Sequence, residues 1–198
     1  MPSTGNVNPV THLIGRTVLS RATGNKLGPI HDLIVNPVEG ELAGLVVQLP
    51  DQSLRLIDYR EIYSFGPDAV MINSDESAMP AQSSPLRALP LARHQLTGAK
   101  VITEGGKVLG QIVHVYVHLA ETSLLVYEVR SSLLDKLLGH TLYFPASQGR
   151  ALSEDAARLV VANDTAEKAD HTLEALTARL FGPPKDEDPV VVVRSRAH

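Results

Sequence analysis

The stretch GKVLGQIVHVYVHL, residues 106–119, decides the fold because a close counterpart occurs earlier in the chain. That counterpart, GNKLGPIHDLIVN at residues 24–36, has the same order of a glycine turn, Leu-Gly, Ile and a run rich in apolar residues. Glycine adopts positive φ at little cost, which suits a tight turn. The run after the turn is typical of a strand, and in the later copy it alternates strictly. A chain that repeats such a unit is predicted to build the same small sheet twice.

The similarity extends over most of each copy, from Leu13 and from Leu96. The matched pairs are Gly15 with Gly98, Val18 with Val101, Gly28 with Gly110, Ile30 with Ile112, Leu33 with Val115, and Val35 with Val117. Strands are expected at 17–21, 29–35, 42–49, 54–59 and 69–73, and the second copy is expected to repeat them, with 111–119, 124–129, 140–145 and 158–163 as its later strands. Short strands separated by turns predict a small antiparallel barrel or sandwich.

The repeated pattern resembles the PRC-barrel family. Both copies open with Gly-x-x-Val and have a turn that ends in Leu-Gly, followed by Ile and a strand; the second also has Tyr143, Phe144 and Pro145, where the first has Asp58-Tyr59. The family's small β-barrel occurs in the cytoplasmic part of the H subunit of purple-bacterial photosynthetic reaction centres. It is also the C-terminal domain of a ribosome-maturation factor. The resemblance implies two PRC-barrel-like domains that serve mainly in assembly or docking.

We therefore expect a mainly β protein, with two small antiparallel β-barrels in tandem and a C-terminal α-helix. The predicted parts are a first domain at 11–75, a Pro/Ser/Ala-rich linker at 76–94, a second domain at 95–163, an amphipathic helix at 164–182 and a tail at 183–198. Leu86, Leu89 and Leu91 of the linker are expected to rest on the second barrel. Residues Val190 to Val193 either add a strand to a barrel edge or form a disordered tail.

Composition limits the classes of function. The 198 residues carry a formal net charge of −4, so the chain lacks a global basic field for nucleic acid or anionic lipid, although a local basic patch remains open. The absence of cysteine removes thiol catalysis, disulfides and cysteine-ligated metals. There is neither a secretory signal nor an apolar run of the roughly 20 residues that a spanning helix needs. We expect a cytoplasmic protein.

The stripe His114, Tyr116 and His118 lies on one face of its predicted strand. Four residues of strand span about 13 Å, whereas two imidazoles on one zinc ion need nitrogens roughly 3 to 3.5 Å apart. The stripe is therefore interpreted as the outer wall of a barrel and as a candidate interface. No nucleophile elbow, phosphate loop or dinucleotide fingerprint occurs. We predict no catalytic, cofactor or metal-binding residues, and hence no enzyme.

Two leucine-rich faces are further interface candidates. The sequence SSLLDKLLG at 131–139 is absent from the first copy, and a short helix there would place Leu133, Leu134, Leu137 and Leu138 on one face. The C-terminal helix would present Ala166, Ala169, Leu173, Leu176 and Leu180. Either face could pack on its own barrel or bind a partner, including a second copy of the chain.

The favoured function is a non-catalytic protein–protein interaction or assembly module, with docking on a membrane or photosynthetic complex as one version. The partner is expected to be another protein or protein complex, and any membrane contact would be peripheral and made through it. The alternative is an RNA- or ribosome-associated maturation factor, which the acidic net charge disfavours. A small-molecule or metal-binding protein is the second alternative.

Overall fold

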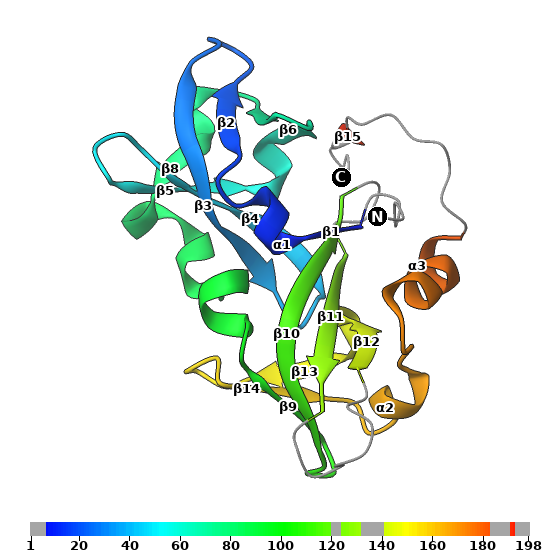
Figure 1. Cartoon of the computed structure of the whole chain (residues 1–198). Coiled ribbons are helices and arrows are strands. Elements are labelled where there is room, and N and C mark those ends of the chain that lie inside the picture. The colour runs from blue at the N-terminus through cyan, green and yellow to red at the C-terminus, as the bar shows by residue number, and fades with distance from the viewer. Residues whose placement is uncertain (1–6, 120–123, 132–140, 183–190, 193–198) are drawn as a thin grey trace.

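The computed structural model describes residues 7–119, 124–131, 141–182 and 191–192, and it contains two twisted sheets (Figure 1). The first sheet contains β2 (Thr17–Ser20), β3 (Lys26–Asn36), β4 (Glu41–Gln48), β5 (Leu54–Asp58), β6 (Ile62–Phe65) and β7 (Ala69–Ile72). The second contains β9 (Lys100–Thr103), β10 (Val108–His118), β11 (Leu125–Arg130), β12 (Thr141–Pro145), β13 (Gly149–Leu152) and β14 (Arg158–Val161). Each sheet has one more of these strands than the sequence predicted.

Both sheets have the same strand order, in agreement with the similarity between the two sequence segments. The first sheet runs β5-β4-β3-β2-β7-β6 and the second runs β12-β11-β10-β9-β14-β13. The registers also correspond, because Asp32, Val46 and Leu56 form one cross-strand row and His114, Glu128 and Tyr143 form the equivalent row. Shorter strands extend the sheets: β1 (Val7–Pro9) pairs with β10, β8 (Ala78–Pro80) with β5, and β15 (Val191–Val192) with β6.

The expected mainly β fold is confirmed, but two closed antiparallel barrels are not. In each half the first strand pairs in parallel with the last, β2 with β7 and β9 with β14. The last two strands of each half form antiparallel pairs, β6 with β7 and β13 with β14. The final strand of each half, β7 or β14, also lies beside the first strand of that half. Among the described strands, neither β5 with β6 nor β12 with β13 closes the ring.

The glycine of the Leu-Gly motif is required at the same place in both halves. A Cβ atom on Gly28 would lie 1.9 Å from the carbonyl oxygen of Gln48, and one on Gly110 would lie 2.1 Å from that of Arg130. Backbone passes too close there for any side chain. The motif that revealed the repeat therefore marks a close strand crossing in each sheet.

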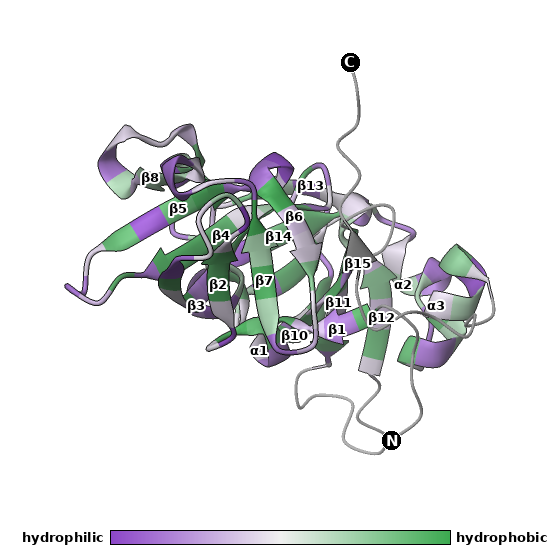
Figure 2. Ribbon diagram, turned by 90° about the horizontal axis from the view of Figure 1, so that it is seen from above, coloured by the Kyte–Doolittle hydropathy of each residue, from purple (hydrophilic) through white to green (hydrophobic). Residues whose placement is uncertain are grey.

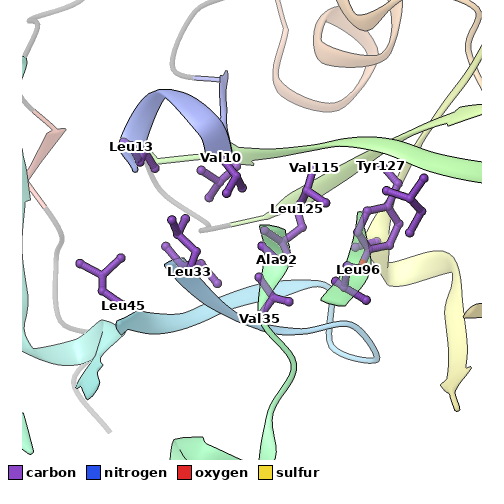
Figure 3. Packing of buried hydrophobic residues seen from close by; sticks show 14 of the residues in the cluster. Val10, Leu13, Leu33, Val35, Leu45, Ala92, Leu96, Val115, Leu125 and Tyr127 are labelled. Carbon is purple, nitrogen blue, oxygen red and sulfur yellow. The ribbon is translucent and has the colours of Figure 1, made fainter. Parts of the chain in front are cut away.

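One hydrophobic core joins the two halves. Ala92 and Leu96 are fully buried between Val35 of the first half and Val115 and Tyr127 of the second (Figure 3). The β3–β4 turn also reaches the second half, where the N–H of residue 125 donates to the carbonyl oxygen of Gly40 at 2.8 Å. The two sheets are thus packed as one body.

The predicted linker is ordered and lies mainly on the first half, contrary to our expectation. Leu86, Leu89 and Leu91 pack against Ile34, Val46 and Leu56, which form the outer face of the first sheet. The short turns of the chain are α1 (Val10–Leu13), η1 (Tyr59–Glu61), η2 (Asp75–Ser77), η3 (Ala81–Ser83), η4 (Pro85–Ala88), η5 (a π-helical turn, Ala92–Leu96) and η6 (Ala146–Gln148). The first sheet attracts the linker because its outer face is apolar.

The prediction of a single C-terminal helix at 164–182 is wrong. The segment forms two helices, α2 (Thr165–Lys168) and α3 (Leu173–Phe181). Between them, the backbone N–H and C=O of Asp170 both pair with Tyr143, which holds the chain extended beside β12. Thr172 then caps α3 by accepting from the N–H of Ala175 at 3.2 Å. Both helices lie beside β12, away from the first half (Figure 1). None of the described helices is long and apolar enough to cross a membrane.

The C-terminal valines follow the first of the two alternatives. Val191 and Val192 form β15, which pairs antiparallel with Phe65 and Ser64 of β6. β15 therefore pairs with the edge of β6, which would otherwise be the outermost strand on that side of the first sheet. Figure 2 shows the contrast between the largely apolar strands and the polar turns around them.

Candidate functional site

The outer faces of the two sheets differ at equivalent positions. The register makes Val46 of the first half equivalent to Glu128, and Leu56 equivalent to Tyr143. The same registers make Ile34, opposite Gly44, equivalent to Tyr116, opposite Val126. At these three positions the first face is therefore apolar, and the second carries a carboxylate between two phenols.

Glu128 is buried with only 6% of its surface exposed, and its carboxylate accepts the Tyr116 hydroxyl at 2.7 Å. The Arg130 guanidinium lies 3.7 Å from its other oxygen. Burial, together with the Glu128 carboxylate, raises the pKa of Tyr116 and raises that of Tyr143 to about 12. Both phenols thus remain protonated donors at neutral pH, and this polar cluster lies on the strands beside α3.

The α3 helix packs on this polar side in cis. Leu176 is fully buried, and the Phe181 ring stacks on His118 with centroids 3.8 Å apart. Arg179 binds the Asp170 carboxylate at 2.8 Å. Leu173 and Leu180 are only half-buried. The cis alternative for this helix is confirmed, while a partner contact through Leu173 and Leu180 stays a prediction.

The predicted stripe is an outer wall, as expected, but its members have different surroundings. His114 is exposed, whereas Tyr116 and His118 are half-buried beside Glu128 and α3. In the part of the chain that the structure describes, no group of three or more His, Asp or Glu side chains is placed to hold a metal ion. The predicted interface residues Leu133, Leu134, Leu137 and Leu138 lie outside the described residues.

Sequence analysis missed a buried carboxylate, Asp32, in the first half. It accepts the backbone N–H groups of Arg93 and His94 at 3.0 and 3.1 Å, and Nδ1 of His94 lies 2.6 Å away. The His31 ring stacks on His94 with centroids 5.3 Å apart. No hydroxyl among the described residues hydrogen-bonds to the His94 ring, so the pair lacks the nucleophile of a hydrolase triad. Its role in the structure is to hold the start of η5 on β3.

A groove of about 540 Å³ lies on the outer face of the first sheet. Its floor contains the buried Ile34 and Leu56, and the linker forms one wall through Leu86 and Leu89. Its remaining lining includes Leu152 and Glu154 from the second half, together with Arg87 of the linker. The volume falls in the range of roughly 300 to 1,000 Å³ that is typical of binding pockets.

Exposed apolar side chains border this groove. Val38 is 54% exposed and Leu54 is 39% exposed, and they are two of the four large hydrophobic residues exposed in the described chain. Apolar side chains that gather at a groove are a common sign of an interaction surface. No signal in the sequence separates these two residues from ordinary strand and turn residues, which is why the groove was not predicted.

The second sheet carries a row of basic side chains that the first sheet lacks. Arg130, Gln111, Lys100 and Arg158 are neighbours across β11, β10, β9 and β14, and all four are exposed. The equivalent row in the first sheet is Gln48, Pro29, Thr17 and Ala69. The duplication thus shows three cations at positions where the sister sheet has only uncharged residues.

The fold is mainly β and contains two sheets of equivalent strand order. Residues 6–79 match the family described as the PRC-barrel domain. The second half repeats the strand order of the first.

Other comparisons add little. A crystal structure described as a candidate 16S ribosomal RNA processing protein, RimM from Pseudomonas aeruginosa, is 18% identical, with 67% of this chain and 94% of that chain covered. The TM-score of this comparison is 0.31. No curated protein matches the sequence.

Proposed function

We propose that the protein is a non-catalytic interaction module that binds an apolar segment of a protein partner in the groove on the first sheet. The groove carries this proposal, because its apolar floor is bordered by Val38 and Leu54, which are exposed to water in the free chain. Covering a leucine-sized side chain contributes roughly 1.5 to 3 kcal/mol. A partner that covers both residues would bury the parts of their side chains that are still exposed, and this burial would favour the complex.

Photo-crosslinking at position 54 in the native host, followed by mass spectrometry, would identify the partner. Binding of the purified partner is then measured for Leu54→Asp and for a matched control, Val108→Asp. Val108 is 53% exposed and lies outside the groove. We expect at least tenfold weaker binding for Leu54→Asp and unchanged binding for Val108→Asp. Equal affinities of both variants would show that the partner binds outside the groove.

Association with RNA or the ribosome is the second candidate function. The basic row of the second sheet favours it, because three cations in one line across a sheet form a local positive surface on an acidic protein. Filter binding to ribosomal RNA at low and moderate salt tests this candidate. Tight binding that weakens steeply with salt would support it.

A further inference from the structure

We infer that the row Arg130, Gln111, Lys100 and Arg158 binds the phosphate backbone of a nucleic acid strand. The inference rests on the second candidate function and adds the surface and the ligand chemistry. Neighbouring strands are about 4.8 Å apart, so the row extends for roughly 14 Å across the sheet. That length presents several cationic donors in a line, which is the arrangement that contacts successive phosphates.

The charges of the row are only partly neutralised. Arg158 lies 3.5 Å from the Asp155 carboxylate, and both side chains are more than half exposed. Arg130 is 60% exposed and lies 3.7 Å from Glu128. Lys100, between them, makes no ion pair with any residue that the structure describes. Solvent-exposed ion pairs are weak, so a phosphate can compete for these guanidinium groups.

A polar hollow of about 450 Å³ lies beside the row. Its lining includes Lys100, Gln111 and Arg158 of the row itself, and also His94, Gln95 and Thr97. These amide, hydroxyl and imidazole groups can hydrogen-bond to a sugar or a base next to the bound phosphates. The hollow therefore extends the row from a line of charges into a surface that suits a nucleotide chain.

The same features favour nucleic acid over an anionic membrane. Basic clusters that bind acidic lipids typically contain about four to eight Lys or Arg residues, and the row has three. The row also lacks apolar side chains that could insert among lipids. It contains no aromatic ring for base stacking, so binding is expected to depend mainly on charge, with little sequence preference.

The test measures anisotropy of a labelled, mixed-sequence single-stranded RNA with the full chain over a series of salt concentrations. Three phosphate contacts predict a slope of log K against log salt of about −2, since each contact contributes about −0.7. Lys100→Gln with Arg158→Gln should weaken binding at least tenfold at low salt and reduce the slope to about −0.7. The matched control is Lys26→Gln with Arg55→Gln, which removes the same charge from the first sheet. We expect it to bind like the wild type.

The outcomes distinguish the second candidate function, RNA association, from the inference that the basic row is the binding surface. If the wild type binds RNA and both double variants bind equally well, the row is wrong and the second candidate function stands. If the wild type binds no RNA at low salt, both are wrong. Vesicles containing phosphatidylserine form a parallel arm, and binding to them without binding to RNA would overturn the choice of nucleic acid.

Discussion

The two outer faces of the molecule show how one duplicated sheet acquired two different covers. In the first half, Ile34, Val46 and Leu56 are covered by leucines of the linker. In the second half, the equivalent Tyr116, Glu128 and Tyr143 form a polar cluster beside α3. The backbone register is the same, so the difference is due to the side chains alone. An apolar face attracts whatever apolar segment follows it, whereas a polar face needs partners for each buried group.

The largest expected effect on stability comes from giving a position of the first face the residue of its equivalent on the second face. Val46→Glu would place a carboxylate among Ile34, Leu56 and Leu86 and opposite the buried Asp32, without the tyrosines that flank Glu128 in the second half. We expect the free energy of unfolding to fall by at least about 3 kcal/mol.

Urea unfolding measures this loss, with Val38→Glu as the control. Val38 is 54% exposed, so its replacement should change stability by less than about 0.5 kcal/mol. A similar loss for both variants would mean that the linker does not keep water from the first face.

A smaller effect is expected from the opposite exchange. Glu128→Val leaves the Tyr116 hydroxyl without its acceptor, which should cost about 2 kcal/mol. The triple variant Tyr116→Ile, Glu128→Val, Tyr143→Leu installs the complete set of the first half, and it should be more stable than Glu128→Val alone.

Urea unfolding of Glu128→Val, of the double variant Tyr116→Ile, Tyr143→Leu and of the triple variant gives the coupling free energy, which we expect to be about 1 kcal/mol or more in favour of the triple variant. Additive losses would show that the three side chains act independently, and the contrast between the faces would lose its physical basis.

The smallest effect is a difference in alkaline stability. The pKa of Tyr143 is about 12 in the folded protein, above the value of about 10 for an unfolded tyrosine. Its contribution to stability is therefore complete below pH 10 and is lost as the pH rises from 10 to about 12. The equivalent residue in the first half is Leu56, which does not titrate.

Urea unfolding between pH 8 and 11.5 should show a shallower alkaline decline for Tyr143→Phe than for the wild type. Absorbance of tyrosinate in the folded state gives an independent check. If the wild type and Tyr143→Phe had the same pH profile, the pKa of Tyr143 would not be raised, and its hydroxyl would be in contact with water.

Much of the fold could be predicted because it depends on local sequence patterns, such as glycine turns and alternating apolar residues. The Leu-Gly turns and the strands after them located β3 and β10, and the repeat fixed which strands correspond. The strands β6 and β13 were both missed, and GRAL of β13 contains two poor strand formers. The break between α2 and α3 depends on Asp170 pairing with Tyr143, a contact between distant residues that helical periodicity does not reveal.

The candidate site was less predictable for the same reason. The alternation placed Tyr116 on the outer face correctly, but its acceptor Glu128 lies on another strand. The carboxylate of Asp32 binds residues 61 and 62 positions away. The basic row became visible only once the register had brought Lys100, Arg130 and Arg158 together.

The burial of Ala92 and Leu96 between the sheets means that the boundary of the family match is not a boundary of the folding unit. A fragment cut at residue 79 would leave both of these side chains behind and would open one side of its interior to water. Excising either sister sheet should therefore yield an unstable polypeptide, and the intact chain should melt in a single transition. We therefore expect the two halves to unfold together as one cooperative unit.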